Sequence, residues 1–268
     1  GYPVQGITLS IINQQMIKKV IPTYWYRSAN FGDRIAPYLV EKISGYKPVY
    51  VGNDNMEIEH IALVGSLLDT TPLSNTHVWG CGFAYESGHT YKPKEIYAVR
   101  GALSRQRYLA NDIECPEVYG DPAILLPKYY SPDIQKKFRL GIIPHTEDYI
   151  NVLARYSNLY ADTLIINLSD SVEAVIDQIL SCEKTISSSL HGLIVSHAYG
   201  VPSRWVEFSD KVIGQGFKFR DYFTTVSADE TPIDLRAMPD VFEIYSEISG
   251  ASFYFNHPPE KLLQNCPL

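Results

Sequence analysis

The sequence predicts an α/β protein with two doubly wound parallel sheets. Apolar, β-rich runs alternate with helical patterns along most of the 268 residues, which is typical of strands connected by crossover helices. The alternation stops once, at a turn-rich basic stretch over residues 127–139, and then begins again. Because a chain of this length has room for two domains of ordinary size, we expect one sheet on each side of that linker.

The composition is that of a soluble globular chain, with 45% hydrophobic and 20% charged residues. The formal net charge of −7 argues against a nucleic-acid partner, because proteins that bind nucleic acid usually present a basic face. Glycine, proline, serine or charge interrupts the apolar runs, so no stretch reaches the length of a membrane span. The four cysteines have no metal-ligand spacing, and we expect reduced thiols and no metal site.

The first domain is expected over residues 16–130. Its predicted strands are residues 19–25, 48–51, 61–64, 76–79, 96–99 and 118–119, and its predicted helices are residues 33–43 and 103–110. Asp33 is expected to cap the first helix, and Pro37 to fall in its first turn, where the missing N–H costs little. Residues 1–15 are interpreted as a remnant of an added or processed leader, with an intrinsic N-terminal extension as the competing interpretation.

The second domain is expected over residues 138–233. Its predicted strands are residues 140–143, 163–166, 185–187 and 204–206, and its predicted helices are residues 147–155, 172–180 and 190–199. Residues 234–268 form a tail whose amphipathic stretches, 241–248 and 253–263, are expected to be helical and to pack back on either domain.

Residues 185–202 carry the most functional information. A buried strand ends in Ser187, Ser188 and Ser189 and turns directly into a helix with His191 in its first turn. The free N–H groups and dipole of a helix start favour phosphate or carboxylate, and a histidine exchanges protons near neutral pH. By itself the segment indicates either an anion site beside a proton donor or an ordinary capped helix with a structural histidine.

Other informative residues lie in loops that follow predicted strands, where open α/β sheets bind their ligands. These loops are residues 27–33, 79–83, 100–101 and 120–122 in the first domain, and residues 144–145, 167–169 and 207–220 in the second. Two sheets that face each other across a cleft would bring the loops together. The Gly-x-Gly at residues 80–82 completes no dinucleotide fingerprint, and the chain has no Walker A loop.

Five motifs along the chain resemble, in their order, those of one enzyme family. They are Asn30-Phe-Gly-Asp33, Val99-Arg-Gly-Ala-Leu-Ser-Arg105, Gly120-Asp-Pro-Ala-Ile-Leu-Leu-Pro127, Gly141-Ile-Ile-Pro-His145, and Ser187-Ser-Ser-Leu-His-Gly192 followed by His197-Ala-Tyr-Gly-Val-Pro202. Over about residues 20–222 the sequence is similar to the polysaccharide pyruvyltransferase family. The resemblance implies two Rossmann-like domains facing across a cleft, as in GT-B glycosyltransferases.

The resemblance also implies the chemistry. A pyruvyl group would pass from phosphoenolpyruvate to two hydroxyls of a sugar, closing a cyclic ketal and releasing phosphate, with no organic cofactor. His191, in the Leu-His-Gly motif, would be the general acid that protonates the enol carbon. Ser187, Ser188, Ser189 and the helix start would hold the anionic donor.

The cation for this donor is expected elsewhere than in some relatives, which place an arginine two residues before the histidine, where this chain has Ser189. The candidates are Arg100, Arg105, Lys218 and Arg220, of which Arg100 and Lys218 are preferred because Arg100 directly follows a strand. His145 follows another strand and is expected to face the same cleft, with a hydrogen-bonded loop histidine as the alternative. His197 is expected to be structural.

The acceptor sugar is expected to meet Asn30, Asp33, Asp121 and Phe83 in the first domain. The aspartates could orient the sugar hydroxyls or accept their protons, although each follows a glycine at a turn, where aspartate is common for local backbone reasons. An aromatic ring such as that of Phe83 suits stacking against a sugar.

Two other functions stay open, because a fold alone does not fix a reaction. One is a nucleotide-sugar glycosyltransferase of the same architecture, and the other is an inactive glycan-binding module. The leading interpretation places the chain in bacterial-type surface or exopolysaccharide biosynthesis in the cytoplasm. Its partners would be phosphoenolpyruvate and a sugar or lipid-linked oligosaccharide, with at most peripheral contact to the inner face of the membrane.

Overall fold

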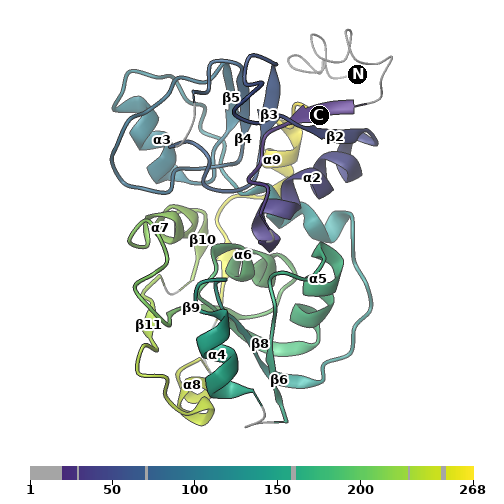
Figure 1. Ribbon diagram of the computed structural model, residues 1–268, viewed down its shortest axis with the longest axis vertical. Helices are drawn as coiled ribbons and strands as arrows, with labels where there is room; N and C mark the ends of the chain where they lie inside the picture. The colour runs from purple at the N-terminus through teal and green to yellow at the C-terminus, as the bar shows by residue number, and fades with distance from the viewer. Residues whose placement is uncertain (1–19, 29, 70–71, 158–160, 229, 249–251) are drawn as a thin grey trace.

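Two five-stranded parallel sheets form the framework of the computed structural model, which describes residues 20–28, 30–69, 72–157, 161–228, 230–248 and 252–268 (Figure 1). The first sheet has the order β2-β1-β3-β4-β5 and the second the order β11-β9-β8-β6-β7. Their strands are β1 (Val20–Thr23), β2 (Lys47–Tyr50), β3 (His60–Ala62), β4 (Thr76–Trp79), β5 (Glu95–Ala98), β6 (Phe138–Ile143), β7 (Thr163–Ile165), β8 (Cys182–Ser187), β9 (Ser203–Glu207) and β11 (Ile233–Asp234). The predicted α/β class with parallel sheets is confirmed, whereas the GT-B-like arrangement and the domain boundaries stay predictions.

Helices cover both sheets (Figure 1). They are α2 (Phe31–Ser44), α3 (Ala102–Leu109), α4 (Tyr149–Tyr156), α5 (Val172–Leu180), α6 (Leu190–Ala198), α7 (Phe217–Phe223), α8 (Val241–Glu247) and α9 (Pro259–Gln264), with a 3-10 helix, η1 (Pro122–Lys128). Among the described residues, every helix falls short of the length and apolarity that crossing a membrane requires. Residues 1–15, interpreted above as a leader remnant or extension, lie outside the described residues.

Several sequence predictions about local structure were wrong. Asn30, not Asp33, caps α2, because its Oδ1 accepts a hydrogen bond from the N–H of Gly32 at 3.0 Å. The helix therefore begins earlier than expected, and Pro37 lies inside it rather than in the first turn. The tail is not one helix over residues 253–263, since β12 (Tyr254–Phe255) pairs antiparallel with β10 (Val226–Ser227) before α9 begins.

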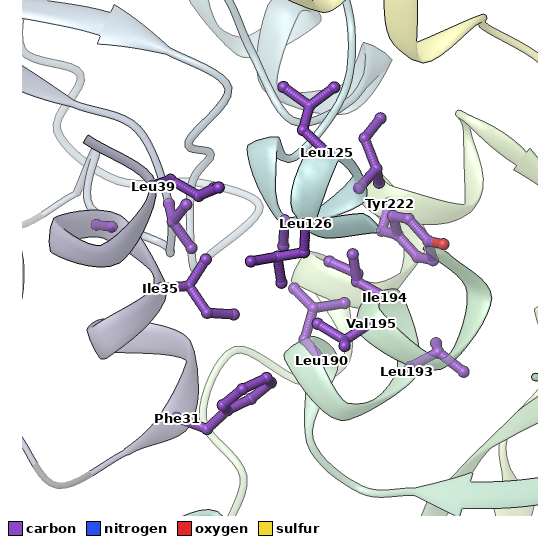
Figure 2. Packing of buried hydrophobic residues seen from close by; sticks show 14 of the residues in the cluster. Phe31, Ile35, Leu39, Leu125, Leu126, Leu190, Leu193, Ile194, Val195 and Tyr222 are labelled. Atoms are coloured by element: carbon purple, nitrogen blue, oxygen red, sulfur yellow. The ribbon is translucent and has the colours of Figure 1, made fainter. Parts of the chain in front are cut away.

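Apolar side chains from both halves of the chain pack into a shared hydrophobic cluster, shown in Figure 2. Its labelled members come from α2, η1, α6 and α7: Phe31, Ile35, Leu39, Leu125, Leu126, Leu190, Leu193, Ile194, Val195 and Tyr222. Polar contacts join α2 to other parts of the second half, since Arg34 donates to the carbonyl of Leu168 at 2.9 Å and Tyr38 donates to Glu173 of α5 at 2.8 Å. The first half of the chain is thus held against α6 by apolar packing and against α5 by a hydrogen bond.

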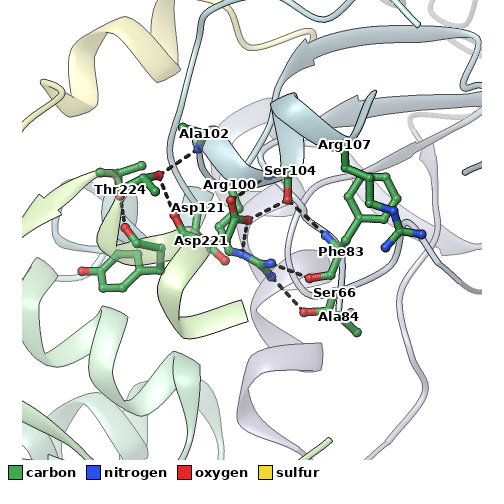
Figure 3. A network of polar contacts seen from close by, with 12 residues as sticks. Ser66, Phe83, Ala84, Arg100, Ala102, Ser104, Arg107, Asp121, Asp221 and Thr224 are labelled. Atoms are coloured by element: carbon green, nitrogen blue, oxygen red, sulfur yellow. Dashed lines mark hydrogen bonds and ion pairs between the residues drawn. The ribbon is translucent and has the colours of Figure 1, made fainter. Parts of the chain in front are cut away.

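A buried ion pair fixes α7, which the sequence did not predict, against the first half (Figure 3). The Nε of Arg100 donates to Oδ2 of Asp221 at 2.9 Å, and both side chains are fully buried. Asp221 also accepts from the backbone N–H of Ser104 at 2.9 Å, in the first turn of α3. This contact caps α3, because its own N-cap residue, Gly101, has no side chain to do so. A Cβ at Gly101 would lie 1.9 Å from the Asp221 carbonyl oxygen, so only glycine allows this approach.

Asp221→Asn should lower the free energy of unfolding by about 3 kcal/mol, because removing one charge of a buried pair leaves the other uncompensated. Urea denaturation of the variant and the wild type measures the difference. Asp54→Asn, at an exposed position, is the matched control and should leave stability within about 0.5 kcal/mol of wild type. Equal stability of the Asp221 variant and the control would contradict the central role of this pair.

Candidate active site

His191 and Asp121 form the centre of the site. The Nε2 of His191 donates to Oδ2 of Asp121 at 3.0 Å, across 70 residues of sequence. Asp121 is fully buried and is positioned by its own turn, since its Oδ1 accepts from the N–H of Ala123 at 2.9 Å and so caps η1. The carboxylate of Asp121 therefore binds the imidazole through Nε2 and leaves Nδ1 for another partner.

The N-terminus of α2 lies against that second nitrogen. A Cβ on Gly32 would lie 2.4 Å from Nδ1 of His191, so the absence of a side chain at Gly32 lets the helix start approach the ring. Asp33, the next residue, accepts a hydrogen bond from the hydroxyl of Ser28. Burial raises the pKa of Asp33, while the Ser28 hydrogen bond and the nearby His191 oppose this rise. A carboxyl group with a raised pKa is a better proton acceptor than an exposed one.

Lys218 supplies a cation to the site from α7. Its side chain is half-buried, and burial, reinforced by the positive charge of Arg100, lowers the pKa of Lys218 to about 8, against the opposing effect of Asp33. No carboxylate among the described residues lies within salt-bridge distance of its Nζ. The ammonium group is therefore available to an anionic ligand.

The serine run builds the strand-to-helix turn. Ser187 donates to the carbonyl of Ile143 at 3.1 Å, and Ser188 donates to Asp148 at 2.9 Å while accepting from the N–H of His145 at 2.8 Å. Ser189 is the N-cap residue of α6 by position but makes no side-chain hydrogen bond to the helix. Ser189 thus leaves the first-turn N–H groups of α6 without the usual N-cap hydrogen bond, as an anion site requires.

His145 lies beside Ser188 and near the charge of Lys218. Burial lowers the pKa of His145, and the charge of Lys218 adds to this effect while Asp148 opposes it. Asp148, which the sequence analysis missed, is almost fully buried and accepts hydrogen bonds from Ser188 and from Ser209. Its only sequence signal is its place three residues after His145.

Three other predicted site residues lie in different surroundings. Arg100 gives its charge to Asp221 and donates further to the hydroxyl of Ser66 at 2.8 Å and to a backbone carbonyl. Arg220 is exposed and donates to the carbonyl of Gln215 at 2.9 Å. Phe83 is fully buried, with the guanidinium of Arg107 3.9 Å from its ring centroid. Their assignments to donor and acceptor stay predictions, and these contacts do not favour them.

His197, expected to be structural, and Arg105, a candidate cation that was not preferred, both make polar contacts within the protein. His197 is buried, contacts the hydroxyl of Tyr222 at 2.9 Å, and has its pKa lowered to about 4 by burial, which fits the expected structural histidine. Arg105 donates to the carbonyl of Cys115 at 3.0 Å. Within the described part of the chain, no group of three or more His, Cys, Asp or Glu residues is arranged to hold a metal ion.

The sequence was compared with known proteins. Residues 30–210 match the family described as polysaccharide pyruvyl transferase. The chain belongs to this family. The match includes Asn30, Asp33, Asp121 and His191 but ends before Lys218. The candidate cation of this family member therefore lies outside the matched region.

Two curated relatives are similar to this family member over most of their length. Uncharacterized protein L143 of Acanthamoeba polyphaga mimivirus is 31% identical over 215 residues, which cover 77% of this chain and 74% of the relative. Succinoglycan biosynthesis protein ExoV of Rhizobium meliloti (strain 1021) is 28% identical over 248 residues, which cover 87% of this chain and 72% of the relative. No solved structure shows significant similarity to the chain.

Gly32→Ala should displace the imidazole of His191, because the added methyl carbon would lie 2.4 Å from Nδ1 and 2.8 Å from Cγ. The ring resonances of His191 in long-range proton–nitrogen NMR spectra should shift, and the Nε2–H signal bonded to Asp121 should weaken or move. Glu41→Ala, at an exposed position of the same helix, should leave these signals in place. Unchanged His191 signals in the Gly32 variant would contradict the contact.

Proposed function

We propose that the protein transfers the pyruvyl group of phosphoenolpyruvate onto two hydroxyls of a sugar, forming a cyclic ketal and releasing phosphate. The observation that carries this proposal is the contact between His191 and Asp121 at the uncapped start of α6. A proton donor, free helix N–H groups and the ammonium of Lys218 gather there, and phosphoenolpyruvate needs all three. Membership of the family supports the transferase class.

His191 acts as the general acid in this proposal. Because Asp121 binds Nε2, Nδ1 is the nitrogen that gives a proton to the methylene carbon of phosphoenolpyruvate. The new C–H bond leaves the adjacent carbon, which carries the phosphate oxygen, electrophilic, and the first sugar hydroxyl attacks that carbon. Asp121 stabilises the imidazolium form and fixes its orientation, the task that a carboxylate performs for histidine in other proton-transfer sites.

The remaining protons balance the reaction. The first hydroxyl gives its proton to Asp33, whose raised pKa suits it as an acceptor. Phosphate leaves as its C–O bond breaks, and the second hydroxyl closes the ketal at the same carbon. One of the two hydroxyl protons returns to His191, which gave its own proton to form the methyl group. The other hydroxyl proton leaves on phosphate.

Lys218 and the start of α6 bind the anionic donor in this proposal. Lys218 replaces the arginine that some relatives carry at the position of Ser189, and among the predicted cations it is the one not committed to a carboxylate or carbonyl of the described residues. The name of the Rhizobium relative supports polysaccharide biosynthesis as the setting. With phosphoenolpyruvate as donor, the reaction would occur in the cytoplasm, on a free or lipid-linked sugar at the inner face of the membrane.

His191→Ala should reduce turnover by at least about 100-fold, because general acid catalysis contributes at least that factor. The assay incubates the protein with phosphoenolpyruvate and a panel of sugar acceptors, and reads phosphate release together with mass gain of the acceptor. His89→Ala, at an exposed position, is the control and should keep full activity. Release of a nucleoside diphosphate from a nucleotide sugar, with none from phosphoenolpyruvate, would instead establish a glycosyltransferase.

The kcat/KM for phosphoenolpyruvate should fall as the pH rises through about 8, because the pKa of Lys218 is lowered to about 8 and only its charged form binds the anion. Lys218→Gln should lower kcat/KM about tenfold at pH 7 and remove this part of the pH dependence. Lys218→Arg keeps its charge at higher pH, so the fall should move upward. An identical alkaline profile in all three proteins would exclude Lys218 from donor binding.

A further inference from the structure

A cavity of about 420 Å³ lies beside the His191 site, and none of the proposed proton-transfer or donor-binding steps uses it. It opens at the carboxyl ends of β8 and β9, and its size is that of a small-ligand pocket. Its lining includes Ser188, Trp205, Glu207, Asp210, Gln215 and Gly216. Two of them join it to the site, since Ser188 bonds the backbone of His145 and Gly216 begins the helix that carries Lys218.

The charge of this cavity is opposite to that of the donor site. No lysine or arginine among the described residues lines it, whereas two carboxylates, Glu207 and Asp210, do. Asp210 pairs with Arg236 at 2.7 Å, but the carboxylate of Glu207 has no hydrogen-bond donor among the described residues. A phosphate or carboxylate ligand would be repelled here, while hydroxyl groups could donate to Glu207.

The wall of the cavity offers the other groups that a sugar ring uses. Trp205 and Phe219 stack with ring centroids 4.5 Å apart, and both line the cavity with edges of side chains that are otherwise buried. Gln215, at the rim, carries an amide that can both donate and accept. It lies in a turn where Gly214, Gln215 and Gly216 all have positive φ, at 89°, 46° and 76°.

We propose that this cavity binds the acceptor sugar as an uncharged ring and that Glu207 selects against acidic sugars. The inference rests on the proposed function, because a ketal forms on two hydroxyls that must reach the donor at His191, and this cavity adjoins that site. Glu207 and Gln215 hold the ring hydroxyls that do not react. Phosphoenolpyruvate stays on the side of Lys218.

The test measures binding without turnover. Saturation-transfer NMR compares methyl glucoside, methyl galactoside, methyl N-acetylglucosaminide and methyl glucuronide on the wild type, Glu207→Gln and Gln215→Gly. Glycine suits the positive φ of Gln215, so the second variant removes the amide and keeps the turn. Glu57→Gln, at an exposed position, is the matched control.

We expect at least one neutral glycoside to bind the wild type and the control, and to bind each cavity variant about tenfold more weakly. We also expect the preference for methyl glucoside over methyl glucuronide to be about tenfold and to shrink in Glu207→Gln. A merely structural role of Glu207 would not change this preference. Equal binding to all four proteins, or no binding by any glycoside, would overturn the inference.

The same proteins separate this inference from the proposed function. Binding that depends on Glu207, without phosphate release from phosphoenolpyruvate, would retain the sugar site and reject the pyruvyl transfer. Phosphate release with unchanged acceptor KM in Glu207→Gln would retain the transfer and reject the site.

Discussion

The buried carboxylate of Asp221 is the constraint on which the site depends. It neutralises Arg100, caps α3 through Ser104 and fixes α7 against the first half of the chain. Helix α7 in turn carries Lys218 toward Asp33 and His145. Separating the two halves here would leave Arg100 or Asp221 as a lone buried charge, which is costly. The ion pair therefore holds the halves together at this point. The contact between His191 and Asp121 joins the same two halves, with an apolar cluster packed between them.

Arg100 shows how far sequence reasoning reaches. Its place after β5 predicted a side chain in the cleft that holds the donor, but the sequence could not reveal that Asp221, 121 residues later, takes its charge. The guanidinium still acts on the site at a distance, since its field contributes to the lowered pKa of Lys218. Arg100 is therefore a positioning residue in the proposed reaction.

Periodicity and loop placement predicted most of the remaining fold, because parallel strands and long amphipathic helices have strong local patterns. The contact between Asp121 and His191 was not predicted, although both residues were chosen, since sequence places each at a strand end without its partner. Helix α7 was missed because its seven residues are too short to show a helical period and are mostly aromatic. Phe83 was chosen for its ring, but its burial depends on Arg107 and Tyr108, which no local pattern connects to it.

The charges around α7 divide the proposed site into two parts with different ligands. On one side Lys218 and the open helix start of α6 attract an anion, and on the other Glu207 and Asp210 line a cavity to whose wall the described residues contribute no lysine or arginine. The proposed acceptor cavity would otherwise be open to a second molecule of the proposed donor, phosphoenolpyruvate, which is smaller than a sugar and carries two acidic groups. Electrostatic repulsion excludes it more effectively than shape could, because a cavity large enough for a sugar admits any smaller molecule. In the proposed reaction, the carboxylate of Glu207, for which the described residues supply no hydrogen-bond donor, would thus keep the anionic donor out of the acceptor cavity.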